Sequence, residues 1–504
     1  MRLIWESHLK EIGPFTTTLL ASIFTLLMAV SASAAPVGDQ ALADLIEHGD
    51  RAAAMALVRE RADVNAVQAD GSTALAWAAH HDDLELATLL ITAGAKVNAA
   101  NEYGITPLSL ACVNGSAAMV EKLLAAGADP NIVQLRNGET PLMTAARTGN
   151  VVVVRMLLSK GAQVDARESR RGQNALMWSA SRSHAGVVMA LLERGADAKV
   201  ASKNGFTALM FATRNGHLDI ARMLVSTGAG LNDRSPEDGT ALVVAAAGGH
   251  EDLALFLLEK GADPNLADAY GITPLHFAAQ KGIADLSAVE YTNSVRPPRN
   301  LPRLAKALLA KGANPNAAIS KDYASNTRSP YRHTAPMSLT GATPYFLAAA
   351  AGDVELMRLL AASGANTMMK VKGDTTVLMV AAGSGRVQDF LAGEEPQHLE
   401  AVRLALQHGA EVNAANAKGQ TAVMAAASAG ANSVVRLLAE VGADLNVRDR
   451  IGMTPWTIAL AMSPLANYAG ELRLHQETAE LLVELGARTM TRDEFDATVE
   501  KERY

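Results

Sequence analysis

Residues 106–131 read TPLSLACVNGSAAMVEKLLAAGADPN, and this stretch decides the fold of the chain. Thr106 is a preferred residue for capping a helix N-terminus, and Pro107 suits the first helical position. A Gly-Ser turn then leads to a second apolar run with a Leu-Leu pair, which is typical of a helix with one buried face. Gly127 is typical of a left-handed helix end, and the Asp-Pro-Asn that follows favours a turn. The stretch therefore predicts two short helices followed by a projecting turn, or finger.

The same pattern recurs along the chain with a period close to 33 residues. The capping position of each unit is occupied by Thr73, Thr106, Thr140, Asn174, Thr207, Thr240, Thr273, Thr343, Thr376, Thr421 and Thr454. A Gly-Ala pair follows the cap by 21 residues in most units, and a degenerate unit begins earlier, at Gln40. Because one such unit can bury its apolar face only against a neighbour, the spacing predicts about twelve stacked helix-turn-helix units.

This pattern resembles the ankyrin repeat. One unit contains the tetrad Thr273-Pro274-Leu275-His276, and the run Leu-Leu-x-x-Gly-Ala-Asp-x-Asn occurs at 123–131 and 257–265. The resemblance covers about residues 40–490. It implies an all-α ankyrin-repeat solenoid with short finger turns. It also implies a protein that binds other proteins through the concave face of the stack and is not an enzyme.

The N-terminal segment, residues 1–34, has the layout of a secretory signal peptide. Leu19–Val30 is an uncharged apolar run, and the small residues Ala32-Ser33-Ala34 that follow favour cleavage. We therefore expect a periplasmic or secreted protein, or a membrane-anchored one if the segment is retained. The remaining chain is assigned to a degenerate N-terminal capping repeat (35–72), six regular repeats (73–272), five repeats with insertions (273–486) and a C-terminal capping helix (487–504).

Four insertions interrupt the repeats of the C-terminal half. They lie near residues 283–302, 319–340, 386–397 and 462–473. One interpretation is that they are surface loops, because added loop length costs little stability. The other is that they form a docking appendage, because long loops are often functional. The sequence leaves both interpretations open.

Composition excludes several functional classes. The 504 residues contain 45 Lys and Arg against 52 Asp and Glu, a net charge of −7, so the chain is not a polybasic nucleic-acid binder. A single cysteine, Cys112, excludes an internal disulfide framework and a multi-cysteine zinc site. There is no Walker loop, HExxH or GxSxG motif. We expect no catalytic residues and no cofactor.

Methionine replaces the histidine of the tetrad in five units, at Met143, Met177, Met210, Met379 and Met424. In an exported protein such a column raises the hypothesis of a Cu(I) carrier, because thioether sulfur binds Cu(I). However, stacked helices lie ~8–10 Å apart, too far for sulfurs of successive units to share one ion. We therefore interpret the column as core packing, for which methionine is well suited.

Basic residues gather at the positions that ankyrin families use for binding, on the fingers and at the end of each first helix. In three successive units these positions hold Arg136, Arg147, Arg170, Arg171, Arg182, Lys203 and Arg214, which we call the basic strip. Glu139 is the acidic residue among them, so seven minus one gives a local charge of +6. Tyr103, Phe206 and Tyr270 occupy the same register and are predicted aromatic anchors.

Together these features predict an exported, monomeric scaffold that binds a protein partner, with an acidic partner favoured by the basic strip. An anionic glycan or phosphate-rich polymer is the second ligand class that could use the strip. Two other functions stay open. One is a membrane-tethered adaptor, and the other is an enzyme or metal carrier that uses the insertions.

Overall fold

The computed structural model describes residues 41–286, 300–322, 337–385, 393–462 and 474–502. It divides into two compact units, the N-terminal unit with described residues 41–236 and the C-terminal unit with described residues 237–502. The expected signal segment lies outside the described residues, as do large parts of the four insertions. Among the helices that are described, none is both long enough and apolar enough to cross a bilayer.

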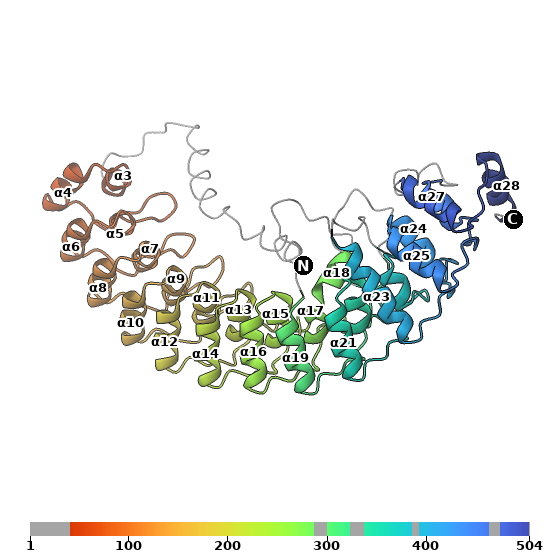
Figure 1. Ribbon diagram of the computed structural model, residues 1–504. Helices are drawn as coiled ribbons and strands as arrows, with labels where there is room; N and C mark the ends of the chain where they lie inside the picture. Colours follow the sequence, from red (N-terminus) through yellow and green to blue (C-terminus); the bar gives the residue numbers. More distant parts are fainter. Residues whose placement is uncertain (1–40, 287–299, 323–336, 386–392, 463–473, 503–504) are drawn as a thin grey trace. The chain divides into compact units, whose positions relative to one another are not determined.

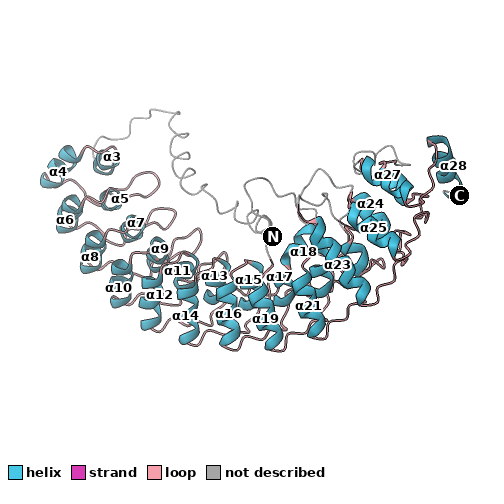
Figure 2. Ribbon diagram, in the orientation of Figure 1, coloured by secondary structure: helices cyan, strands magenta, loops and turns pink. Residues whose placement is uncertain are grey.

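The N-terminal unit consists of six helix pairs (Figure 1). The first helices of successive pairs contact one another in one row, and the second helices do so in another. Figure 2 shows both rows as helix, with loops between them. The helices are α3 (Ala41–Glu47), α4 (Arg51–Arg59), α5 (Ala74–His80), α6 (Leu84–Thr92), α7 (Pro107–Asn114), α8 (Ala117–Ala125), α9 (Pro141–Thr148), α10 (Val151–Ser159), α11 (Ala175–Ser181), α12 (Ala185–Glu193), α13 (Ala208–Arg214) and α14 (Leu218–Ser226).

The C-terminal unit also contains six helix pairs, with one extra short helix, α18, and a terminal helix, α28. Its helices are α15 (Ala241–Ala247), α16 (Glu251–Glu259), α17 (Pro274–Ala278), α18 (Gln280–Leu286), α19 (Pro302–Ala310), α20 (Pro344–Ala350), α21 (Val354–Ala362), α22 (Val377–Ala381), α23 (Glu395–Gln407), α24 (Ala422–Ser428), α25 (Asn432–Glu440), α26 (Pro455–Ala459), α27 (Gln476–Glu484) and α28 (Arg492–Glu502). The expected all-α class is confirmed. In the described residues, helices account for the regular structure apart from isolated β-bridges in the fingers, such as that between Val67 and Thr73.

Local sequence explains where the helices begin and end. The hydroxyl of Thr140 accepts a hydrogen bond from the amide of Met143 at 3.2 Å, which satisfies an N–H that the helix itself leaves unpaired. Thr106 and Ser109 make the reciprocal bonds of a capping box. At the other end of a pair, Gly127 has φ +91° and a Cβ there would meet no atom within 4 Å, so only the left-handed backbone demands glycine.

The core runs between the two rows and consists mostly of small and branched apolar side chains. Ala145 and Ala146 of α9 are fully buried. Their small side chains allow the first helices of adjacent repeats to approach closely. Leu157 of α10 is also fully buried, and Leu158 is 8% exposed. The five methionines of the column are 1–2% exposed, so they fill the core of their units.

Fingers and loops link each repeat to the next by hydrogen bonds. In the loops that follow the second helices, six asparagines each make the same two hydrogen bonds to the following repeat. The Nδ2 of Asn98 donates to the carbonyl of Gly127 at 3.0 Å, and its Oδ1 accepts from the amide of Asp129 at 2.8 Å. The six are Asn65, Asn98, Asn131, Asn265, Asn316 and Asn413. We call this arrangement the asparagine bridge.

Two insertions, for which the sequence analysis left a surface loop or a docking appendage open, contain helix at their described ends. Residues 280–286 form α18, whose Ile283 and Leu286 are 8% and 0% exposed and which contacts α20. Residues 395–397 form the first turn of the 13-residue α23, and the buried His398 follows them. Apolar side chains three residues apart give α18 one buried face, and this favours helix over loop. The described ends of these insertions therefore belong to the stack.

The C-terminal helix α28 begins at a capping box. The amide of Thr491 donates to a carboxylate oxygen of Glu494 at 2.7 Å, and the amide of Glu494 donates to the hydroxyl of Thr491 at 3.3 Å. Phe495 is fully buried although the residues around it are exposed. A single aromatic side chain thus attaches an otherwise polar helix to the unit.

Candidate functional site

Hydrogen bonds between fingers bring most of the basic strip together in the N-terminal unit. The carbonyl of Tyr103 accepts from the amide of Leu135 at 3.0 Å. The next contacts are Ser169 N–H to Asn137 O at 2.7 Å and Lys203 N–H to Arg171 O at 2.8 Å. These bonds fix the order of four neighbouring fingers, which carry Tyr103, Arg136, Arg170 with Arg171, and Lys203.

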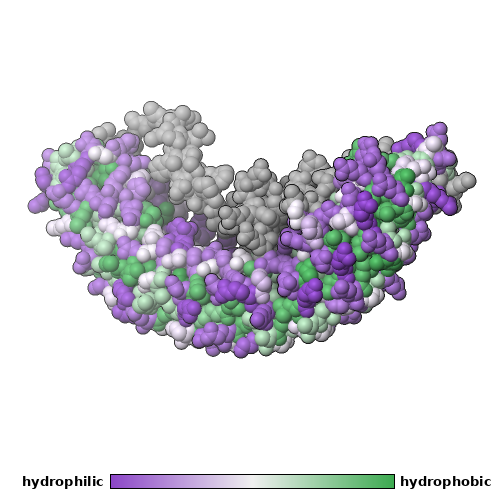
Figure 3. Space-filling model, viewed as in Figure 1, coloured by the Kyte–Doolittle hydropathy of each residue, from purple (hydrophilic) through white to green (hydrophobic). Residues whose placement is uncertain are grey.

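The basic side chains differ in their availability to solvent. Arg136, Arg170, Arg182 and Lys203 are exposed, whereas Arg147, Arg171 and Arg214 are half-buried. The Nζ of Lys203 donates to the carbonyl of Ser169, so this side chain lies back on the preceding finger. The face of the molecule seen in Figure 3 has hydrophilic and hydrophobic residues interspersed.

A buried carboxylate holds Arg147 at the end of α9. Glu139 is 7% exposed and accepts hydrogen bonds from the hydroxyl of Thr144 at 2.8 Å and from Arg147 at 3.3 Å. The Arg147 side chain is 39% exposed, so part of it still reaches solvent. The ion pair orients this arginine and also reduces the local positive charge.

Glu168 is a second buried carboxylate beneath the strip, and the sequence analysis missed it. It is 6% exposed and accepts the amides of Arg170 and Arg171, each at 2.7 Å, and that of Gln173 at 2.9 Å. It lies six residues before the cap Asn174, outside the positions that were counted. Including Glu168 lowers the local charge of these positions by one, from +6 to +5. Its role is to shape the finger that presents two arginines.

Phe206 is not an exposed anchor, contrary to the sequence prediction. Its side chain is 4% exposed, and the guanidinium carbon of Arg214 lies 4.1 Å from its ring centroid. The ring of Phe211 packs against it edge-on, with centroids 5.3 Å apart. Because a cation is favoured over an aromatic face, Arg214 covers Phe206 rather than extending into solvent.

Beside the arginines of the basic strip, Trp178 of α11 and Phe211 of α13 are aromatic side chains that do reach the surface, and both are half-buried. The guanidinium carbon of Arg147 lies 5.7 Å from the Trp178 ring, and that of Arg214 lies 5.9 Å from Phe211. The indole of Trp178 donates to Gln173 at 2.8 Å. Both aromatics lie four residues after the cap, one turn before the positions that carry Arg182 and Arg214. Residues three or four apart share a helix face. This spacing could have shown from the sequence that Trp178 and Phe211 lie beside Arg182 and Arg214.

The two tyrosines of the predicted set lie in different units. Tyr103 is 52% exposed at a finger tip of the N-terminal unit, and a hydrogen bond to Glu102 raises the pKa of its phenol. Tyr270 belongs to the C-terminal unit, where it is half-buried with the Nζ of Lys321 5.4 Å from its ring. Tyr103 therefore belongs with the basic strip, and Tyr270 is described apart from it.

Groups suited to catalysis or metal binding are not gathered at this surface. No cluster of three or more His, Cys, Asp or Glu suited to a metal ion occurs in the part of the chain that the structure describes. Cys112 is fully buried, and burial raises the pKa of its thiol to about 12, so the thiolate needed for a nucleophile does not form near neutral pH. What the surface offers is guanidinium groups beside aromatic rings.

The family model described as "Ankyrin repeats (3 copies)" matches residues 41–134, 119–201, 165–235, 191–268, 229–291 and 390–493. Together these matches span well over half of the 504 residues. The chain is an ankyrin-repeat protein. Ankyrin repeats serve as scaffolds for protein–protein interaction, and the surface built from fingers and first helices is the one through which an ankyrin stack offers variable side chains. The residues described above are therefore candidates for contact with a protein partner.

Proposed function

We propose that this ankyrin-repeat protein binds an acidic segment of a partner protein through the basic strip of its N-terminal unit. The observation that carries the proposal is the placement of arginines beside Trp178 and Phe211, next to fingers that present exposed arginines. Arginine and aromatic residues dominate the energetics of protein interfaces. Exposed charges accelerate association, whereas partly buried aromatics supply apolar contact.

The exposed arginines are the right targets for a test, because they do not hold the fold together. A triple variant, Arg136→Glu with Arg170→Glu and Arg182→Glu, reverses three exposed charges. It spares Arg147, which pairs with Glu139, and Arg214, which covers Phe206. A matched control reverses three exposed charges elsewhere in the same unit, Lys160→Glu with Arg194→Glu and Lys199→Glu.

The probe is a random library of displayed twelve-residue peptides, selected on the wild-type protein at low salt. We expect the selected peptides to be enriched in Asp and Glu. Their binding should fall at least tenfold with the triple variant and at 0.5 M salt, but stay unchanged with the control. Peptides without acidic enrichment, or peptides that bind the triple variant equally well, would contradict the proposal. A heparin fragment that outcompetes the peptides would favour the anionic glycan instead.

We also propose that the protein acts outside the cytoplasm. The support is the sequence of residues 1–34, in which an apolar run precedes a small-residue cleavage site. The measurement is the N-terminal sequence of the protein isolated from cells that express it. A start at Ala35 would support export with cleavage, an intact N-terminus in the membrane fraction would support the tethered adaptor, and an intact N-terminus in the cytosol would contradict export.

A further inference from the structure

The row of fingers in the N-terminal unit contains one apolar residue at a position that is otherwise polar. The amide of Glu102 donates to the carbonyl of Asp70 on the preceding finger at 2.9 Å, and the amide of Leu135 donates to that of Tyr103 at 3.0 Å. The four successive donors at this position are Glu102, Leu135, Ser169 and Lys203. The finger that begins the basic strip therefore presents a leucine where its neighbours present polar side chains.

Leu135 and Tyr103 lie at the tips of two adjacent fingers, and we call them the fingertip patch. They are 72% and 52% exposed. A Cβ at Gly104 would lie 2.9 Å from the Cγ of Leu135, so the glycine allows the leucine side chain to lie against the preceding finger, next to Tyr103. Because water surrounds these two side chains, covering them with an apolar group of a partner is favourable.

Charges of opposite sign lie on the two sides of the fingertip patch. Glu102 precedes Tyr103 and Arg136 follows Leu135, and both charged residues are exposed. A hydrogen bond to Glu102 raises the pKa of the Tyr103 phenol. The charge of Asp70 also raises this pKa, whereas the charge of Arg136 lowers it, so both signs act on the patch. The basic strip continues from Arg136 in one direction along the row, and the acidic residues lie in the other.

We propose that the acidic partner segment has a large apolar residue at one end and that this residue binds the fingertip patch. Such binding requires the acidic-partner function proposed above and adds the position of the segment on the strip. Glu102 repels acidic residues, so the acidic part of the segment extends from the patch toward Arg136 and Arg170. Successive repeats lie ~8–10 Å apart and an extended chain advances ~3.3 Å per residue, so about three residues of the segment span one repeat.

Fluorescently labelled peptides test this on the purified full chain, with anisotropy measured at low salt. The leucine peptide, Leu-Ser-Gly-Glu-Glu-Ser-Glu-Glu, has its apolar residue three positions before the first glutamate. The serine peptide has serine in place of that leucine. The exchanged peptide swaps the leucine with the serine between the glutamates, which places acidic residues on both sides of it. Each peptide is also made in reverse, because the patch does not set the direction of the backbone.

We expect the leucine peptide, in at least one direction, to bind at least about fivefold more tightly than the serine peptide, because it buries a large apolar side chain. The exchanged peptide should bind more weakly than the leucine peptide, because two of its glutamates then lie beside Glu102. Both the leucine and the serine peptides should lose affinity with the triple variant of Arg136, Arg170 and Arg182, which removes the charge that attracts them.

The patch variant, Tyr103→Ser with Leu135→Ser, changes two exposed residues, so its melting temperature should equal that of the wild type. It should abolish the advantage of the leucine peptide and leave the binding of the serine peptide unchanged. The matched control is Val152→Ser with Met189→Ser, which removes two apolar residues, 54% and 46% exposed, from the second helices α10 and α12. The control should keep the advantage of the leucine peptide.

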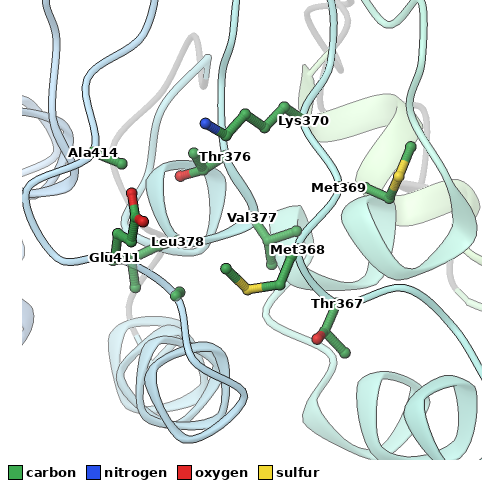
Figure 4. Close-up of a pocket in the computed structure, with 10 residues that line it drawn as sticks. Thr367, Met368, Met369, Lys370, Thr376, Val377, Leu378, Glu411 and Ala414 are labelled. Carbon is green, nitrogen blue, oxygen red and sulfur yellow. The ribbon is translucent and has the colours of Figure 1, made fainter.

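A pocket in the C-terminal unit is another place that could accept the leucine side chain. It has a volume of about 90 Å³, and its lining includes Val377 and Leu378, which are 2% and 1% exposed, and Met368 (Figure 4). Met368 is 46% exposed, so Met368→Ser alters the pocket without removing a buried side chain. This variant should also keep the advantage of the leucine peptide.

The possible results distinguish the fingertip patch from the basic strip. Binding that the triple variant weakens, but that gains nothing from leucine, would overturn the role of the patch and leave the acidic-partner proposal standing. An equal gain for the exchanged peptide, an advantage that survives the patch variant, or one that is lost with Met368→Ser would overturn it as well. Absence of any binding that the triple variant weakens would contradict both proposals.

Discussion

Two titratable residues of one repeat respond to pH in opposite directions. Asp268 uses a carboxylate oxygen to accept the amides of Tyr270 and Ile272, at 2.8 and 2.9 Å, and burial raises its pKa to about 6. His276 is fully buried, and burial lowers its pKa to about 4. The amide of Thr273 donates to its Nδ1 at 3.1 Å, so the neutral ring keeps its proton on Nε2, which faces the carbonyl of Ala342 at 3.2 Å.

The two residues make opposing contributions to stability between pH 4 and 6. The folded state holds the Asp268 proton more tightly than the unfolded chain, whose carboxyl has a pKa near 3.8. The contribution of Asp268 to the free energy of unfolding is therefore lost as the pH rises through 6. The unfolded chain binds a proton at His276 near pH 6.5 and the folded state does not, so this contribution is lost as the pH falls below 6.5. We therefore expect the two effects to compensate partly in the wild type.

Replacing Asp268 with asparagine should remove the pH-dependent contribution of the carboxyl group and leave that of His276. The carboxamide oxygen of the new side chain would keep the acceptor for both amides, as Asn101 does at the same finger position. We expect Asp268→Asn to stabilise the C-terminal unit by about 1–2 kcal/mol at pH 7.5, a value reduced for partial solvent exposure, and by little at pH 4. Urea denaturation at several pH values measures this.

A reverse substitution in the same unit provides the control for Asp268. Asn416 accepts the amides of Lys418 and Gln420 in the same manner. Asn416→Asp should therefore destabilise the unit more at pH 7.5 than at pH 4. A gain in stability for Asp268→Asn that is the same at both pH values would show that the charge of Asp268 is not its cause.

At the scale of the elements, the ends of the helices were predictable because their signals are local. A threonine hydroxyl caps a helix wherever it precedes one, and glycine allows the left-handed residue that ends one. The pairs α7/α8 and α9/α10 follow directly from such residues. Helix α18 and the first turn of α23 did not, because they depend on packing against the rest of the unit: Ile283 and Leu286 of α18 and His398 of α23 are buried there.

One helix end departs from this rule and allows a direct test. Arg61 follows α4 with φ +68°, where Gly94 follows α6 with φ +91°. A residue with a Cβ pays about 1 kcal/mol in this conformation. Arg61→Gly should therefore stabilise the N-terminal unit by about 1 kcal/mol, as measured by urea denaturation.

Gly94→Ala tests the same cost in the opposite direction. A Cβ at Gly94 would meet no atom within 4 Å, so the loss should reflect the backbone alone and also amount to about 1 kcal/mol. Two variants with shifts of the same sign would be incompatible with this account.

At the scale of the whole chain, each repeat is stabilised mainly by its neighbours. Helix α10 contacts α8 and α12 as well as its own partner α9, so its buried face is shared by three repeats. Stability in such a stack is a sum of contributions from repeats and from their interfaces. Damage to one interior helix should therefore extend to the adjacent repeats.

Leu157 and Val152 allow this to be measured on a single helix. Leu157 is fully buried and Val152 is 54% exposed, both in α10. We expect Leu157→Asp to destabilise the N-terminal unit by about 3–5 kcal/mol and to accelerate hydrogen exchange in α8 and α12. Val152→Asp should change stability by less than about 0.5 kcal/mol. Faster exchange confined to α10 would argue against shared stability.

The sequence by itself determined the repeat, the helix pairs and the fold class, because caps, glycine ends and apolar spacing act within a few residues of the chain. It also placed the basic strip, because the finger positions recur with the repeat. The tertiary structure decided which of these side chains are available. Phe206 is covered by Arg214, Trp178 and Phe211 reach the surface instead, and Leu135 is exposed at a finger tip. Exposure depends on which side chains pack around a residue, within its own repeat and from the next one, and a side chain's own position in the sequence does not contain that information.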